Sequence, residues 1–362
     1  METYLYFYTI ELILLFLSSI RKNSFFFFIA VFISILFSGF RHNVGYDYLN
    51  YVYFYEAYNE ISFFEIEPLF KLVISIFRYF TNDHHYFLFF CSFVTISFIV
   101  LGIRKISVYQ ECSYMIFLLI PSLFLTSFSI VRFALAMSLF FYALASYIRG
   151  KNKIIFSIFS ICSIGCHYTM LYMYIFFLFA NSFFYVRYSS FFYCFLLFSS
   201  ILLFYIEVPI FILQKLLVGK YLAYQEQMGS MTNFKIFFVF LFSIFIIIES
   251  RYMKSTIENN FLLNVVLFNS MIVMLFYSFP HVARIGYILS MFQVILIPNM
   301  ISIDRKEKNK GRLYWKYISS SLLIGSYFLM PIIVLWTDIS SDRNGFKFTP
   351  YDNFLFYMVG WK

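Results

Sequence analysis

Long apolar runs dominate the chain, and most of them approach the roughly 20 residues that cross the hydrocarbon core of a bilayer. Strands of a membrane barrel would instead alternate apolar and polar positions. The pattern therefore predicts an all-α polytopic membrane protein with about 12 transmembrane helices, within a range of about 11–14. The predicted spans are residues 3–20, 24–40, 86–103, 113–128, 131–148, 154–166, 168–186, 190–206, 235–250, 260–279, 283–303 and 316–336.

Basic residues near the span ends orient these helices, because lysine and arginine mark the cytoplasmic side. Arg21, Lys22, Arg104, Lys105, Arg149, Lys151, Lys153, Arg187, Arg251, Lys254 and the basic run 305–312 all fall on one side. This orientation predicts extracytoplasmic loops at 41–67 and 207–234 and an extracytoplasmic tail at 337–362. The first apolar run lacks the basic start and the cleavage site of a signal peptide. We therefore expect residues 1–362 to form a single integral membrane domain.

The apolar segment 68–80 does not fit the predicted orientation as a membrane-spanning helix. If it spanned the membrane, Arg104 would lie outside, against the charge rule. Lys71 and Arg78 also suit an interfacial position better than a lipid-facing one. We therefore expect a re-entrant or interfacial segment near 68–80. The alternative is that 68–80 does cross and another weak segment does not.

The composition narrows the class of protein further. Of the 362 residues 62% are hydrophobic and 12% charged, the net charge is +9 and the mean hydropathy is +0.80. A soluble protein has about 45–50% apolar and about 25% charged residues, so these values exclude a soluble enzyme. The predicted cytoplasmic loops are short, and the chain has no Gly-rich phosphate-binding motif. The spacing of Cys162, Cys166 and His167 does not match haem attachment. We expect no cofactor, no metal site and no nucleic-acid partner.

The segment after the second predicted span carries the first candidate chemistry. Arg41 at the membrane edge can donate two hydrogen bonds to a phosphate. Asp47 can accept a proton from a hydroxyl group. The tyrosines that flank Asp47 can stack on sugar rings or bond to hydroxyls, and they are Tyr46, Tyr48 and Tyr51. The alternative is an interfacial aromatic belt with a snorkelling arginine.

Further polar residues stand at the predicted outer ends of later spans. Arg132 begins one span, His167 lies in an outer hairpin, and Arg284 begins another span. Together with Arg41, the two later arginines place three cations on the face where the charge rule predicts few. This favours a site for a lipid-linked anion, with His167 able to move a proton. The alternative is three unrelated snorkelling arginines.

The ordered motifs resemble the EpsG/Wzy type of bacterial polysaccharide polymerases. The first is Arg41-His-Asn-Val-Gly45-Tyr-Asp47-Tyr48-Leu-Asn-Tyr51, and the second is Glu67-Pro68-Leu69-Phe70. Arg132-Phe-Ala-Leu135-Ala136, the basic turn 149–153, His167, Arg284-Ile285-Gly286-Tyr287 and Pro350-Tyr351 follow in order. The resemblance covers nearly the whole chain. His42 and Tyr168 depart from the family pattern.

The resemblance implies a glycosyltransferase that joins oligosaccharide repeat units on undecaprenyl pyrophosphate. The reaction would occur at the outer face of the bacterial plasma membrane and produce O-antigen or a related surface glycan. Its partners would be lipid-linked donor and acceptor oligosaccharides, membrane lipids and a chain-length regulator protein. Asp47 or His167 would be catalytic, and the substrate-binding residues would be Arg41, Gly45, Tyr48, Tyr51, Arg132 and Arg284. Since the sequence shows no metal cluster of carboxylates, we expect a metal-independent reaction.

Two other functions use a similar architecture. A flippase for lipid-linked oligosaccharides would carry cations deep in a central cavity and show internal symmetry. A membrane acyltransferase that modifies sugars would need a hydrophilic cytosolic entrance for acyl-CoA. The predicted outer-face arginines and the short cytoplasmic loops favour the polymerase over both.

Overall fold

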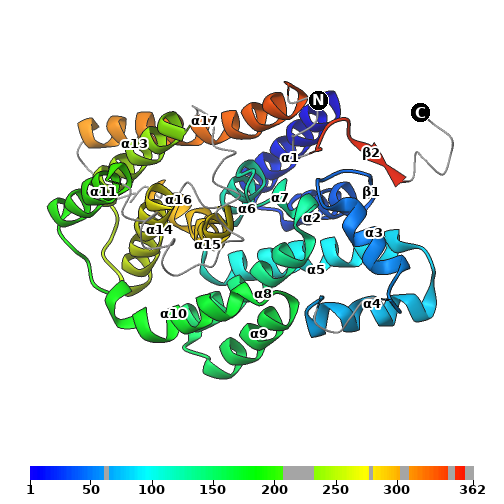
Figure 1. Cartoon of the computed structure of the whole chain (residues 1–362). Helices are drawn as coiled ribbons and strands as arrows, with labels where there is room; N and C mark the ends of the chain where they lie inside the picture. The colour runs from blue at the N-terminus through cyan, green and yellow to red at the C-terminus, as the bar shows by residue number, and fades with distance from the viewer. Residues whose placement is uncertain (61–64, 207–231, 277–279, 302–309, 341–346, 355–362) are drawn as a thin grey trace. The chain divides into compact units, whose positions relative to one another are not determined.

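The computed structural model describes residues 1–60, 65–206, 232–276, 280–301, 310–340 and 347–354, and these residues are mostly helical (Figure 1). Within them, five helices are long and apolar enough to cross a membrane: Glu2–Arg21, His84–Ile106, Val131–Gly150, Ile257–Leu275 and Ile318–Ile339. Shorter apolar helical segments are Ser24–Gly39, Lys153–Cys166, Thr169–Phe179, Ser190–Tyr205, Ile236–Ser250 and Ile285–Ile301, the last of which includes the turn between two helices. This is the architecture of an all-α membrane protein.

The chain divides into two compact units, and the first comprises residues 1–174 and 303–362. Its helices are α1 (Glu2–Arg21), α2 (Ser24–Gly39), α3 (Tyr48–Glu56), α4 (Pro68–Phe80), α5 (His84–Ile106), α6 (Gln110–Leu119), α7 (Thr126–Ser129), α8 (Val131–Gly150), α9 (Lys153–Cys166) and α17 (Lys310–Ser340). Strands β1 (Arg41–His42) and β2 (Asp352–Asn353) also belong to it. The helix α10 (Thr169–Phe184) starts in this unit and ends in the second.

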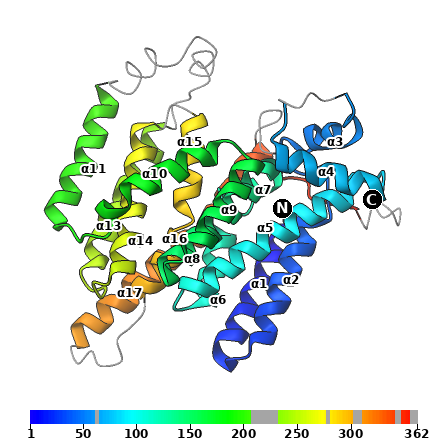
Figure 2. The same cartoon turned by 90° about the horizontal axis from the view of Figure 1, so that it is seen from below.

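Short capped turns join the helices of the first unit. α1 ends at Arg21, Lys22 takes the left-handed conformation, and the Asn23 side chain accepts a hydrogen bond from the backbone of Phe25. α1 and α2 therefore form the hairpin seen in Figure 2. The Asn152 side chain caps α9 in the same way. Most side chains of α8 are buried because this helix packs against both α5 and α9.

The second unit, residues 175–302, has its own apolar core. It contains the end of α10 together with α11 (Ser190–Tyr205), α13 (Thr232–Ser250), α14 (Ile257–Leu275), α15 (Pro280–Ser290) and α16 (Gln293–Ile301). Asn264 of α14 is buried and donates to the backbone carbonyls of Phe184 and Val186, at 2.8 and 2.7 Å. Its side-chain oxygen accepts from the Tyr193 hydroxyl at 2.6 Å. These bonds satisfy a polar side chain in an apolar core.

Two predicted spans are not single helices. The span expected at 113–128 is α6 followed by a turn and the short α7, because Pro121 follows Ile120 and disfavours a helical conformation there. The span expected at 283–303 is divided into α15 and α16. The turn between them has the tighter hydrogen bonds Met291 N–H to Ile288 and Phe292 N–H to Leu289.

The expected interfacial segment 68–80 is α4, whose 13 residues are fewer than the roughly 20 needed for a crossing. Near its start, Leu69 contacts Gly165 at the end of α9. Near its end, Arg78 donates to the last backbone carbonyls of α3, those of Tyr55 and Glu56, both at 2.5 Å. Both ends of α4 thus meet segments predicted on the outer face, which favours an interfacial helix over a thirteenth crossing.

The C-terminal tail begins later than the predicted residue 337, because α17 continues to Ser340. The described tail residues return to the first unit, where β2 pairs antiparallel with β1. The backbone carbonyl of Phe348 accepts from the Tyr4 hydroxyl at 2.7 Å, and the Asp338 carboxylate accepts from the Phe348 backbone at 2.8 Å. The tail is therefore docked beside the segment that follows α2. The predicted outer loop 207–234 lies outside the described residues up to 231.

Candidate functional site

Arg41 is positioned differently from the expected phosphate contact. Its side chain is buried, and its guanidinium donates to the Ser38 carbonyl, to the Ser92 hydroxyl at 3.1 Å and to the Phe128 carbonyl at 3.4 Å. The group also lies over the Phe128 ring. Burial lowers the pKa of Arg41, yet a guanidinium stays protonated in proteins. Arg41 therefore joins α2, α5 and α7 in this structure instead of presenting its charge to a ligand.

We expect Arg41→Ala to reduce stability. The substitution removes the guanidinium that donates to the buried carbonyls of Ser38 and Phe128. Each buried carbonyl left without a hydrogen bond costs about 1–3 kcal/mol of stability. The melting temperature of the detergent-solubilised protein should fall. An unchanged melting temperature would contradict this structural role of Arg41.

Gly45 allows the turn after β1 to pack closely on α7. Its φ angle is +103°, which residues with a side chain rarely adopt, and a Cβ atom would lie 2.4 Å from the Phe128 carbonyl oxygen. The Gly45 amide donates to the Lys347 carbonyl of the tail at 2.9 Å. The next amide, of Tyr46, donates to the Ser129 hydroxyl at 3.0 Å. In the structure Gly45 therefore has a backbone role that sets the start of α3, and its expected part in substrate binding stays a prediction.

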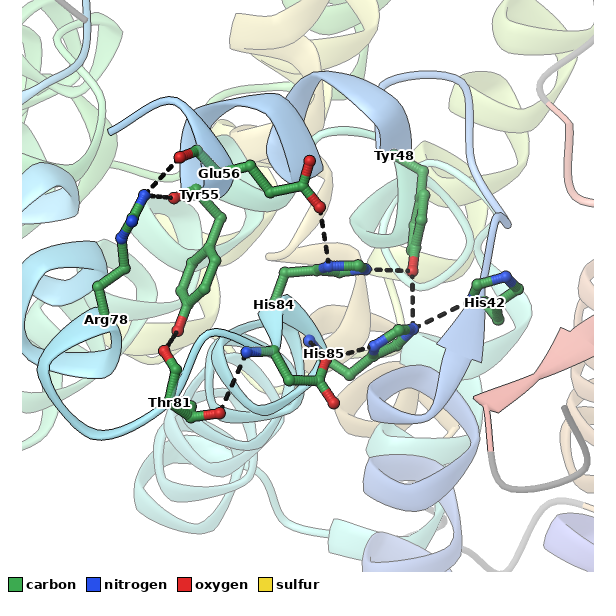
Figure 3. A network of polar contacts seen from close by, with 9 residues as sticks. His42, Tyr48, Tyr55, Glu56, Arg78, Thr81, His84 and His85 are labelled. Carbon is green, nitrogen blue, oxygen red and sulfur yellow. Dashed lines mark hydrogen bonds and ion pairs between the residues drawn. The ribbon is translucent and has the colours of Figure 1, made fainter. Parts of the chain in front are cut away.

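A cluster of histidines lies beside this turn. We define the histidine cluster as His42 of β1, Tyr48 of α3, and Asp83, His84 and His85 at the start of α5 (Figure 3). His42 Nδ1 lies 3.0 Å from His85 Nε2. The Tyr48 hydroxyl lies 3.2 Å from Nε2 of both His84 and His85. His85 Nε2 thus contacts both His42 Nδ1 and the Tyr48 hydroxyl, and the same hydroxyl contacts His84 Nε2.

Two carboxylates border the histidine cluster. Asp83 caps α5 by accepting from the His85 backbone at 2.9 Å, and it lies 2.6 Å from His85 Nδ1. Burial alone would raise the pKa of Asp83, but these hydrogen bonds and the nearby imidazoles lower it below its usual value. Glu56 lies 3.9 Å from His84 Nδ1. The Phe354 ring of the tail stacks on His85.

A second cluster is centred on a buried acid. We define the Glu67 cluster as Glu67, Tyr51, Arg132 and His167. Arg132 Nη1 lies 2.8 Å from Glu67 Oε2, and His167 Nδ1 lies 3.6 Å from Glu67 Oε1. The Tyr51 hydroxyl accepts from the Arg132 backbone amide at 3.4 Å. The cluster thus joins the start of α4, the start of α8, the end of α9 and the middle of α3.

The surroundings of the Glu67 cluster are apolar and aromatic. The Arg132 guanidinium lies over the rings of Phe54 and Phe70, at 5.2 and 6.0 Å from their centroids. The Arg132 side chain keeps 23% of its surface exposed, whereas that of Glu67 keeps 8%. Burial raises the pKa of Tyr51 to about 12, so its hydroxyl stays protonated at neutral pH. Part of the Arg132 charge therefore stays open to a ligand in a setting of reduced polarity.

The structure brings together some of the expected site residues. Arg132 and His167, separated by 35 positions in the sequence, share the Glu67 carboxylate. Asp47 is half-buried at the start of α3, where its carboxylate accepts from the Asn50 side chain at 3.2 Å. Arg284 lies on α15 in the second unit, and its side chain is outside the described part of the chain.

Sequence reasoning missed Glu67, His84 and His85 as site residues. Glu67 appeared only within the motif that precedes α4, although an acid directly before an apolar helix is a signal for a paired, buried charge. The consecutive Asp83-His84-His85 at the start of an apolar helix was a visible signal as well. His42, which departs from the family pattern, contacts His85 in the structure.

The apolar helices and the buried polar clusters at their ends define a multi-pass membrane protein. The chain matches the model of the EpsG family over residues 24–353, and it therefore belongs to that family. Membership fits a general role in polysaccharide polymerisation. Neither the comparison with curated proteins nor that with solved structures gives a match.

Proposed function

We propose that the protein polymerises oligosaccharide repeat units carried on undecaprenyl pyrophosphate, at the outer face of the bacterial plasma membrane. The product would be O-antigen or a related surface glycan. Membership of the EpsG family supports the class of reaction. The predicted orientation supports the face, because Glu67, Arg132 and His167 fall on the side away from the basic cytoplasmic loops.

The Glu67 cluster is the observation that carries this proposal. Departure of a lipid pyrophosphate creates negative charge, and a fixed cation beside an apolar wall stabilises it. Arg132 is such a cation, because Glu67 and the rings of Phe54 and Phe70 hold its guanidinium in place. Its partial exposure leaves room for a phosphate oxygen.

The transfer step can be written with these residues. The acceptor hydroxyl oxygen bonds to the anomeric carbon of the donor while the bond between that carbon and the pyrophosphate oxygen breaks. The hydroxyl proton moves to a base, for which His167 and Asp47 are the two candidates. The pyrophosphate leaves with its lipid, and Arg132 stabilises its charge. Glu67 positions both Arg132 and His167.

A deletion strain tests the proposed function against a flippase. Without the protein, we expect the surface glycan to carry a single repeat unit in place of a ladder of lengths, because units still reach the outer face but are not joined. Gel electrophoresis of the extracted glycan measures this. Loss of all surface glycan, with lipid-linked units accumulating inside, would contradict the polymerase and indicate the flippase. A plasmid copy of the wild-type gene that restores the ladder is the control.

A further inference from the structure

We propose that the histidine cluster binds one transition-metal cation of the zinc class, with His42, Tyr48, His84 and His85 as its ligands. This goes beyond the proposed function and does not depend on it. Neutral imidazole nitrogens are favoured ligands of zinc, copper and nickel ions. The sequence predicted no metal site, because the residues are distributed over β1, α3 and α5 and meet only in the fold (Figure 3).

Three distances between neighbouring candidate ligand atoms are close to those of tetrahedral coordination. Four ligands at about 2.0–2.1 Å from a zinc ion lie about 3.3 Å from one another. In the cluster, His42 Nδ1 and His85 Nε2 are 3.0 Å apart, and the Tyr48 oxygen is 3.2 Å from Nε2 of both His84 and His85. A small movement apart of these side chains would accommodate the ion.

His85 has the second contact found around metal-bound histidines, whose other ring nitrogen donates to a carboxylate. His85 Nδ1 lies 2.6 Å from the Asp83 carboxylate, whereas the 3.9 Å between His84 Nδ1 and Glu56 is an ion-pair distance only. With protons on these Nδ1 atoms, the lone pairs of both Nε2 atoms point toward Tyr48. The two carboxylates also offset the charge of a bound cation.

A site with four protein ligands has a structural role. The ion would join β1, α3 and the start of α5. It would thereby hold α3, whose Tyr51 contacts the backbone of Arg132 in the Glu67 cluster. The proposed ion is therefore a clamp on the outer segments and takes no part in the transfer step.

Metal analysis of the purified protein tests the proposal. The full chain, purified in detergent through a tag without histidines, is incubated with zinc chloride and passed over a desalting column. We expect about one equivalent of zinc for each chain. Cobalt(II) in place of zinc should give the strong visible absorption of a tetrahedral complex. A chelator should lower the melting temperature, and added zinc should restore it.

Variants show whether the zinc is bound by the histidine cluster or by another histidine of the chain. His84→Ala and His85→Ala should lose the bound zinc, and Asp83→Asn should weaken zinc affinity about 10–100-fold because it replaces the charged acceptor of His85 Nδ1 with a neutral amide oxygen. His167→Gln is the matched control, since this histidine contacts Glu67 instead, and it should retain full zinc content.

The proposal is overturned if the wild-type protein retains no zinc and gives no tetrahedral cobalt spectrum. The cluster would then be a hydrogen-bonded network. Equal zinc content in the wild type, His84→Ala and His85→Ala would also overturn it. The wild-type zinc content and cobalt spectrum test the proposal without any variant, so poor folding of a variant does not affect the outcome. Glycan polymerisation is not the readout, so the proposed function can fail while the metal site holds.

Discussion

Arg132→Ala is expected to abolish the ladder of glycan lengths while the protein remains in the membrane. The substitution removes the cation that would stabilise the leaving pyrophosphate, and loss of one such group costs about 10²–10³-fold in rate. It also leaves the buried Glu67 without the partner at 2.8 Å. The effect is measured by complementing a deletion strain with the variant and separating the glycan on a gel.

The matched control for this experiment is Arg149→Ala. Arg149 lies on the same helix, α8, but near its opposite end and exposed, so normal ladders are expected. Arg132→Lys should recover only part of the length, because lysine is a point charge without the planar fork. Normal ladders from Arg132→Ala, with membrane levels equal to the wild type, would contradict the role of Arg132 in charge stabilisation.

Gly45→Ala is expected to destabilise the protein strongly and to remove its activity as a consequence. The φ angle of +103° strains any residue with a Cβ, at about 1–3 kcal/mol. The new methyl group would also collide with the Phe128 carbonyl oxygen, 2.4 Å away, and overpacking adds about 1–3 kcal/mol. The chain must then move away from α7, which displaces the start of α3. A lower melting temperature and a lower yield of membrane protein are the expected measurements.

Gly150→Ala provides the comparison for this substitution. No atom would lie within 4 Å of a Cβ atom at Gly150, so the stability should remain close to that of the wild type. Equal melting temperatures for Gly45→Ala and Gly150→Ala would contradict the close packing of the turn on α7.

The sequence pattern predicted the helical class and most helix positions, because apolar length is a local property. Predicted span 24–40 corresponds to α2 and 154–166 to α9, each within one residue at either end. The pattern failed at 113–128, where apolar residues continue through the turn after Ile120. Hydropathy alone cannot separate a helix from a buried turn of the same composition.

The candidate site was predictable in part. Charge sidedness placed Arg132 and His167 on one face, and the fold joins them through Glu67. The same reasoning gave Arg41 a phosphate contact, whereas its guanidinium bonds to the Ser38 and Phe128 carbonyls. Residue type and membrane depth do not show whether an arginine faces a ligand or backbone carbonyls, because the acceptors belong to other helices.

The histidine cluster shows what local patterns leave out. His42 and His85 are 43 positions apart, and Tyr48 reaches them from a third element. Spacing rules for metal sites describe ligands on one short segment. His84 and His85 are neighbours in the sequence, but only the fold brings His42 of the strand and Tyr48 of the short helix to them.

The most direct test of the central claim uses lipid-linked repeat units extracted from the deletion strain. Purified protein in liposomes is mixed with these units, and the glycan length is followed on a gel. We predict that the wild type converts single units to a ladder and that Arg132→Ala does not, while Arg149→Ala behaves as the wild type. Unchanged single units with folded wild-type protein, or an equal ladder from Arg132→Ala, would contradict the claim that the Glu67 cluster polymerises the glycan.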